Sequence, residues 1–272
     1  MKRAKRLAFS QIVFFCALVF FSTNGFADNL TGRQIIDEIE KRHDMPYEFE
    51  NQVMVLVGPD RQKEQRQVRR YKRDTEDGAR YLLVFHEPAG VRGTSLLTWQ
   101  FDDKPDDQWL YLPAMGKKLK RIAEGGKRNY FMGTDYTYED LASEPRDKFS
   151  YERQPDQTID GQDHFIIKAI PVDPKLKQES GYDYQLMYVR KDIFFTTRID
   201  YYNRRGKFIK QQNYQKLYNV KGDTWRANFS IIKNAAENHV TAVQVVGRSF
   251  DEAYVPEGVF AHRFITSGRH LR

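Results

Sequence analysis

Histidine is the residue type best suited to acid–base and metal chemistry, and the 272-residue chain contains six. Their spacing supports neither role, because no HExxH motif and no pair at metal-ligand spacing occurs. They are His43, His86, His164, His239, His262 and His270. We therefore expect structural or exposed histidines, with no metal site and no cofactor.

A catalytic nucleophile is equally hard to place. The nearest approach to a nucleophile elbow runs from Gly247 to Asp251, but Asp251 stands where the second glycine belongs. Neither a P-loop nor a GxGxxG motif is present. The acidic loop at 102–107 lacks the ligand spacing of a calcium site and is typical of a solvated turn. The sequence therefore favours a protein without catalysis, and a secreted hydrolase is the weakest alternative.

The N-terminus has the pattern of a targeting segment. Four basic residues precede an apolar run at 7–21, and Gly25-Phe26-Ala27 places small residues at the −3 and −1 positions. We predict a cleaved secretory signal at 1–27, a mature domain at 28–272 and export to the periplasm of a Gram-negative cell. An uncleaved anchor is the alternative, although a membrane span needs about twenty apolar residues.

Removing the signal changes the charge of the chain. The signal carries four basic and no acidic residues, so 44 Lys and Arg become 40, against 37 Asp and Glu. Such a near balance speaks against nucleic acid as a partner. The only cysteine, Cys16, leaves with the signal, so the mature chain has no means of forming a disulfide.

Beyond a first helix, the chain reads as a succession of strands. Thr31 is a plausible N-cap for that helix, and Ile35, Ile36 and Ile39 form its apolar stripe before Pro46. Alternating apolar and polar residues then recur as far as Gly247. We expect a mainly β, single domain: a highly curved antiparallel sheet of about eleven strands whose apolar face must be covered. A short helix is expected at 256–264.

Aromatic residues make up 14% of the chain, and several share one face of a strand. An aromatic-rich curved sheet either forms a solid core or lines a cavity for an apolar ligand. The residues alone leave these two possibilities open.

The stretch at 109–141 is the most distinctive. It predicts two short strands, a basic loop, a glycine-flanked aromatic segment and a capping pair made by Thr137 and Asp140. Its two blocks LPAMGKKLKRI and FMGTDYTYEDL resemble the outer-membrane lipoprotein-sorting family, the LolA-like periplasmic proteins. The resemblance extends over the whole mature chain, and these blocks are its most specific part.

This resemblance implies an unclosed β-barrel whose concave apolar face, covered by short helices, holds acyl chains in transit between membranes. It implies lipoprotein acyl chains or another lipid as cargo, an inner-membrane RND-type transporter as partner and an outer-membrane acceptor. The alternative of a different class is an accessory subunit that docks to an envelope transporter and uses its aromatics only as core.

Two sets of residues follow for a carrier. The predicted cavity consists of bulky residues on one face of their strands and of a glycine-flanked loop that could cover the opening. It comprises Leu83, Phe85, Leu97, Trp99, Trp109, Tyr111, Phe131, Met132, Leu186, Tyr188, Phe195, Ile199, Phe229 and Ile231. A basic patch, either a solvated face or a site for a partner or anionic headgroup, comprises Lys117, Lys118, Lys120, Arg121, Lys127 and Arg128.

Overall fold

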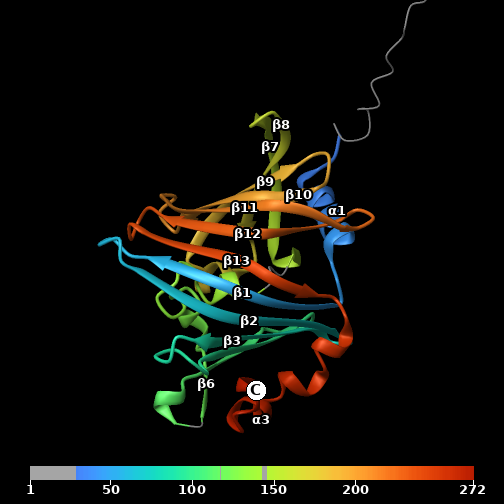
Figure 1. Ribbon diagram of the computed structural model, residues 1–272. Helices are drawn as coiled ribbons and strands as arrows, with labels where there is room; N and C mark the ends of the chain where they lie inside the picture. Colours follow the sequence, from blue (N-terminus) through green and yellow to red (C-terminus); the bar gives the residue numbers. More distant parts are fainter. Residues whose placement is uncertain (1–28, 117, 143–145) are drawn as a thin grey trace, which may run out of the picture. The chain divides into compact units, whose positions relative to one another are not determined.

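The computed structural model describes residues 29–116, 118–142 and 146–272, so the predicted signal lies outside the described residues. Residues 31–272 form one compact unit built on a single antiparallel sheet (Figure 1). In the described part of the chain, no helix is both long and apolar enough to cross a membrane.

The sheet has 13 strands. They are β1 (Tyr47–Val57), β2 (Lys63–Thr75), β3 (Gly78–Glu87), β4 (Ser95–Phe101), β5 (Asp107–Tyr111), β6 (Leu119–Arg121), β7 (Phe149–Ile159), β8 (Gln162–Pro171), β9 (Tyr182–Arg190), β10 (Phe195–Asn203), β11 (Phe208–Lys221), β12 (Thr224–Asn234) and β13 (His239–Ser249). The α-helices are α1 (Gly32–His43), α2 (Pro174–Glu179) and α3 (His262–Thr266), and short 3-10 turns fill several connections.

The strand order is β6-β5-β4-β3-β2-β1-β13-β12-β11-β10-β9-β8-β7. Every neighbouring pair is consecutive in the chain except β1 and β13, which join the first and last strands at the centre of the sheet. The ends β6 and β7 stay unpaired with each other, so the sheet is curved but not closed. The predicted fold class is confirmed, with thirteen strands rather than about eleven. The shortest, β6, has only three residues and lies within the second short strand predicted for the stretch at 109–141.

Helix α1 begins as the sequence predicts. Thr31 and Gln34 form a reciprocal capping box, and Ile35 and Ile36 are buried as the helix packs on β7 and β12. At the start of the helix, a Cβ on Gly32 would lie 2.3 Å from the carbonyl oxygen of Tyr151. Glycine therefore permits the close approach of α1 to β7.

Strands β3 to β5 are buried on both faces. One face contributes to a core that also takes residues from β1, β2 and β13 and from the connection after β6. The opposite face packs against the C-terminal segment around α3, which lies beside β3 in Figure 1. The predicted terminal helix at 256–264 is realised as a 3-10 turn, Glu257–Phe260, followed by α3.

Candidate ligand-binding cavity

A cavity of about 630 Å³ lies on the concave face of the sheet. Side chains from β1, β2 and β9–β13 form its walls together with α1 and α2, and residues near 139–142 border it. Its apolar lining includes Ile36, Ile39, Met54, Leu83, Met187, Phe195, Ile199, Val243 and Val245. The volume falls within the range of about 300–1,000 Å³ that is usual for small-molecule sites.

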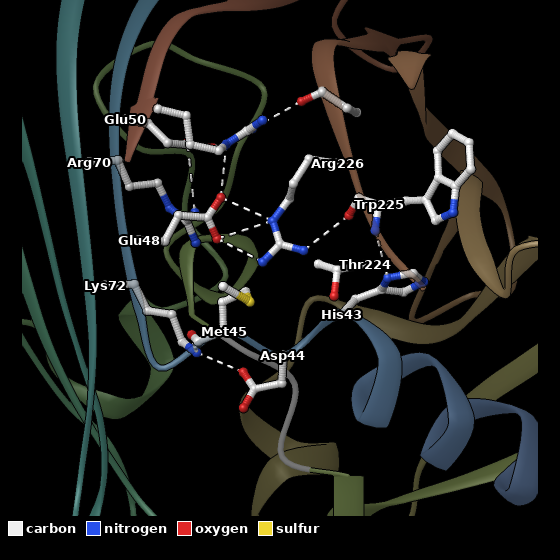
Figure 2. Close-up of polar contacts among 12 residues, drawn as sticks. His43, Asp44, Met45, Glu48, Glu50, Arg70, Lys72, Thr224, Trp225 and Arg226 are labelled. Carbon is white, nitrogen blue, oxygen red and sulfur yellow. Dashed lines mark hydrogen bonds and ion pairs between the residues drawn. The ribbon is translucent and has the colours of Figure 1, made fainter. Parts of the chain in front are cut away.

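The cavity also contains a group of charges, here called the charged cluster: Glu48 and Glu50 on β1, Arg70 on β2, Arg226 on β12 and Arg248 on β13. Arg226 donates from Nε and Nη2 to the two carboxylate oxygens of Glu48, each at 3.0 Å (Figure 2). Arg248 Nη2 donates to Glu50 Oε1 at 2.5 Å. The sequence led us to expect a concave face that is apolar throughout. The structure shows instead that this face also contains charged side chains.

Strand geometry explains how these charges meet. Residues two apart on a strand share a face, so Glu48 and Glu50 point to the same side of β1. Glu50 stands opposite Arg70 on β2 and opposite Arg248 on β13 in the register of the sheet. Burial alone would raise the pKa of Glu48, but the guanidinium of Arg226 lowers it below the usual value. The carboxylate is thus kept charged inside the cavity.

Residues 129–142, here called the plug loop, fill the concave side next to the cavity. The Phe131 ring stacks on Phe85 with centroids 5.6 Å apart. The fully buried Lys210 donates from Nζ to Asp135 O at 2.8 Å and to Asp140 Oδ2 at 2.5 Å. The predicted capping pair is present, since Thr137 N donates to Asp140 and Asp140 N donates to Thr137.

Glu139, on the same loop, borders the cavity and accepts a hydrogen bond from Gly181 N at 2.9 Å. Burial, reinforced by the neighbouring carboxylate of Asp140, raises the pKa of Glu139 to about 7. Burial likewise raises the pKa of Tyr136 to about 12, and its hydroxyl lies 3.4 Å from Ser230 Oγ. At neutral pH the Tyr136 phenol is therefore neutral, and the Glu139 carboxyl is about half protonated.

Four of the fourteen predicted cavity residues border it: Leu83, Phe195, Ile199 and Phe229. Phe229 differs from the other three, because its ring lies 5.3 Å from the Nζ of the exposed Lys216. The neighbouring Ser230 contacts Tyr136 in the cavity, so alternation turns the Phe229 side chain to the outer face.

The remaining ten do not line the cavity, and the prediction is corrected for them. Phe131 and Met132 of the plug loop pack with Phe85 in the core beside the cavity. Leu97, Trp99, Trp109 and Tyr111 belong to the opposite face under the C-terminal segment, where Trp99 Nε1 donates to Phe260 O at 3.1 Å. Both faces of β3 to β5 are apolar, so alternation alone does not show which face is concave.

The last three of these ten residues have side chains that point away from the cavity: Leu186, Tyr188 and Ile231. Tyr188 donates to Asp200 Oδ2 at 3.1 Å, and Leu186 stands opposite Asp200 on β10. Their neighbours Gln185 and Met187 border the cavity instead. For β9, the sequence predicts the strand correctly, but the prediction assigns the wrong one of its two faces to the cavity.

The basic patch is only partly described, because Lys117 lies outside the described residues. Lys118, Lys120, Arg121 and Arg128 are exposed, with Arg121 paired to Asp107. Lys127 borders the cavity and donates to Asp106 O at 3.2 Å. Docking by this patch stays a prediction.

The charged cluster was missed by sequence reasoning. A signal was present, since Glu48 and Glu50 share their strand face with the buried Met54 and Leu56. Acidic residues in line with a buried apolar set indicate a polar site. Among the described residues, no group of three or more His, Cys, Asp or Glu side chains could hold a metal ion.

A family model described as "Uncharacterized protein" matches residues 77–267. No curated protein matches the chain in sequence. Among solved structures, an outer membrane lipoprotein-sorting protein domain from Vibrio parahaemolyticus is 28% identical, with a TM-score of 0.80 over 86% of this chain and 98% of that one.

Two further structures share the fold. A DUF1329 family protein from Desulfovibrio piger is 24% identical, with a TM-score of 0.76 over 85% of this chain and 98% of that one. A LolA superfamily protein from Nitrosomonas europaea is 16% identical, with a TM-score of 0.67 over the same shares. The chain therefore belongs to the family whose model spans residues 77–267, and its structure is that of the LolA-like, outer-membrane lipoprotein-sorting proteins.

Proposed function

We propose that the protein is a periplasmic carrier that binds acyl chains of a lipoprotein or another lipid in the cavity and moves them toward the outer membrane. The observation that carries this proposal is a cavity of about 630 Å³ on the concave face of a lipoprotein-sorting fold. Apolar walls of this kind exclude water and favour hydrocarbon chains. No catalytic step is part of the proposal.

The route extends the proposal beyond the cavity. Export would use the signal at 1–27, an inner-membrane RND-type transporter would deliver the cargo, and an outer-membrane acceptor would receive it. The exposed basic residues Lys118, Lys120, Arg121 and Arg128 are proposed to contact an acidic partner or anionic headgroups during transfer. Such contacts would weaken as the salt concentration rises.

Native mass spectrometry of protein purified from a Gram-negative periplasm tests the carrier. The wild type should retain copurified lipid. Ile199→Trp would fill part of the cavity and should lower the lipid-bound fraction several-fold. Ile231→Trp is the matched control, because Ile231 lies on the outer face of β12, and it should bind lipid like the wild type. A lipid-free wild type that binds no added fatty acid would favour a docking subunit instead.

A further inference from the structure

The charged cluster leaves one guanidinium without a close partner. Arg226 pairs with Glu48 through two nitrogens and donates a third bond to Trp225 O at 3.0 Å. Arg248 donates to Glu50, to the Tyr218 hydroxyl at 2.9 Å and to Asn228 Oδ1 at 3.1 Å. These two arginines therefore have their donors used within the protein.

Arg70 differs from both. Its nearest carboxylate oxygen is Glu50 Oε2, at 3.8 Å from Nη1, which is too long for a hydrogen bond. That oxygen already accepts from Gln52 Nε2 at 2.5 Å, and Glu50 Oε1 accepts from Arg248. Across the part of the chain that the structure describes, the Arg70 guanidinium makes no hydrogen bond.

The surroundings keep this arginine charged and turned toward the cavity. Arg70 is a lining residue, and its side chain is 37% exposed, so that free surface faces the cavity. Burial disfavours the charge, but the carboxylates of Glu50 and Glu48 outweigh burial and raise the pKa of Arg70. The charged cluster contains three guanidinium groups and two carboxylates, so its own net charge is +1.

An anionic ligand would neutralise the net positive charge of the charged cluster. A guanidinium offers five N–H donors in a planar fork that matches a carboxylate or a phosphate. Opposite Arg70 in the register lies Leu83, which with Met54 belongs to the apolar wall. An acidic group at Arg70 would therefore leave a hydrocarbon chain in contact with apolar side chains, whereas a neutral lipid would leave the guanidinium unmatched.

We propose that the cargo is an anionic amphiphile whose carboxylate or phosphate group binds Arg70 while its acyl chain fills the apolar part of the cavity. This inference rests on the proposed carrier function and narrows the chemical class of the cargo. It identifies Arg70 as the residue that selects the headgroup.

Three ligands of one chain length test the inference on the purified mature protein: palmitate, hexadecyl phosphate and hexadecanol, each measured by displacement of a fluorescent fatty alcohol. The wild type should bind the two anions at least about tenfold more tightly than the alcohol. Arg70→Gln should lose that preference and keep its affinity for hexadecanol. Arg205→Gln, at an exposed turn residue, is the control and should behave like the wild type.

Each outcome separates the two claims. Equal binding of acid and alcohol by the wild type would overturn the headgroup inference and leave the carrier standing, whereas no binding of any ligand would overturn the carrier. An anion preference that survives in Arg70→Gln would place the headgroup elsewhere. Displacement by inorganic phosphate as strong as by hexadecyl phosphate would assign Arg70 to a free anion. Should Arg70→Gln fail to fold, Arg70→Lys, which keeps the charge but loses the fork, should reduce the preference several-fold.

Discussion

Arg248 pairs with both carboxylates of the charged cluster, those of Glu48 and Glu50. Its side chain is 7% exposed. Arg248→Met would leave two buried carboxylates short of a partner, so we expect a loss of about 3–5 kcal/mol in the free energy of unfolding. Urea denaturation measures this loss. Arg205→Met should change stability by less than about 0.5 kcal/mol.

The same cluster offers an internal check. Adding Glu50→Gln to Arg248→Met removes one of the stranded charges and should restore part of the lost stability. Arg70→Met should cost far less than Arg248→Met, because the carboxylate oxygen of Glu50 nearest to Arg70 lies 3.8 Å away and accepts no hydrogen bond from it. A loss below about 1 kcal/mol in Arg248→Met would show that water reaches the carboxylates and that the cluster does not stabilise the fold.

At the scale of elements, the plug loop contains one carboxyl, that of Glu139, whose pKa is raised by burial. Glu139 has an ordinary pKa of 4.5 and a folded-state pKa of about 7, so the folded protein binds this proton more tightly. Its contribution to stability is complete below pH 4.5 and is lost as the pH rises toward 7 and above. The loss amounts to at most about 3 kcal/mol.

Glu139→Gln removes this titration while its side-chain oxygen still accepts from Gly181 N. The variant should match the wild type near pH 4.5 and be more stable than it at pH 8. Urea unfolding of both proteins at these two pH values measures the difference in their free energies of unfolding. Other titrating groups are the same in both proteins, so their effects cancel in this difference. If the difference in stability is independent of pH, Glu139 titrates near its ordinary value and is solvated.

Sequence patterns predicted the helices and strands better than they predicted which side chains of these elements face the cavity. The alternation in β9 and β10 and the capping residues of α1 depend on near neighbours, and the structure contains these elements. Whether Leu186 or Met187 faces the cavity depends on the curvature of the whole sheet, to which no local pattern responds. Trp99 and Trp109 were misplaced for a related reason, because a C-terminal segment distant in sequence covers them.

At the scale of the whole molecule, the concave side of the sheet has a packed core in one region and a cavity in another. Around β3, the Phe85 side chain is fully buried against Phe131, whereas Phe195 on β10 borders the cavity. Phe85→Ala should lower the free energy of unfolding by about 3–5 kcal/mol, because the vacated space has few ways to refill. Phe195→Ala should cost less than about 2 kcal/mol, since its ring already faces a void on one side.

Ligand binding should show the opposite order. Phe195→Ala should weaken binding of a fluorescent fatty acid several-fold, while Phe85→Ala, measured where it remains folded, should bind like the wild type. The pair is matched in chemistry, so a difference between the two substitutions reports only their positions. If both cost the same stability and neither changes binding, the concave face is packed throughout, and the aromatics of this chain serve as core in a protein that docks rather than carries.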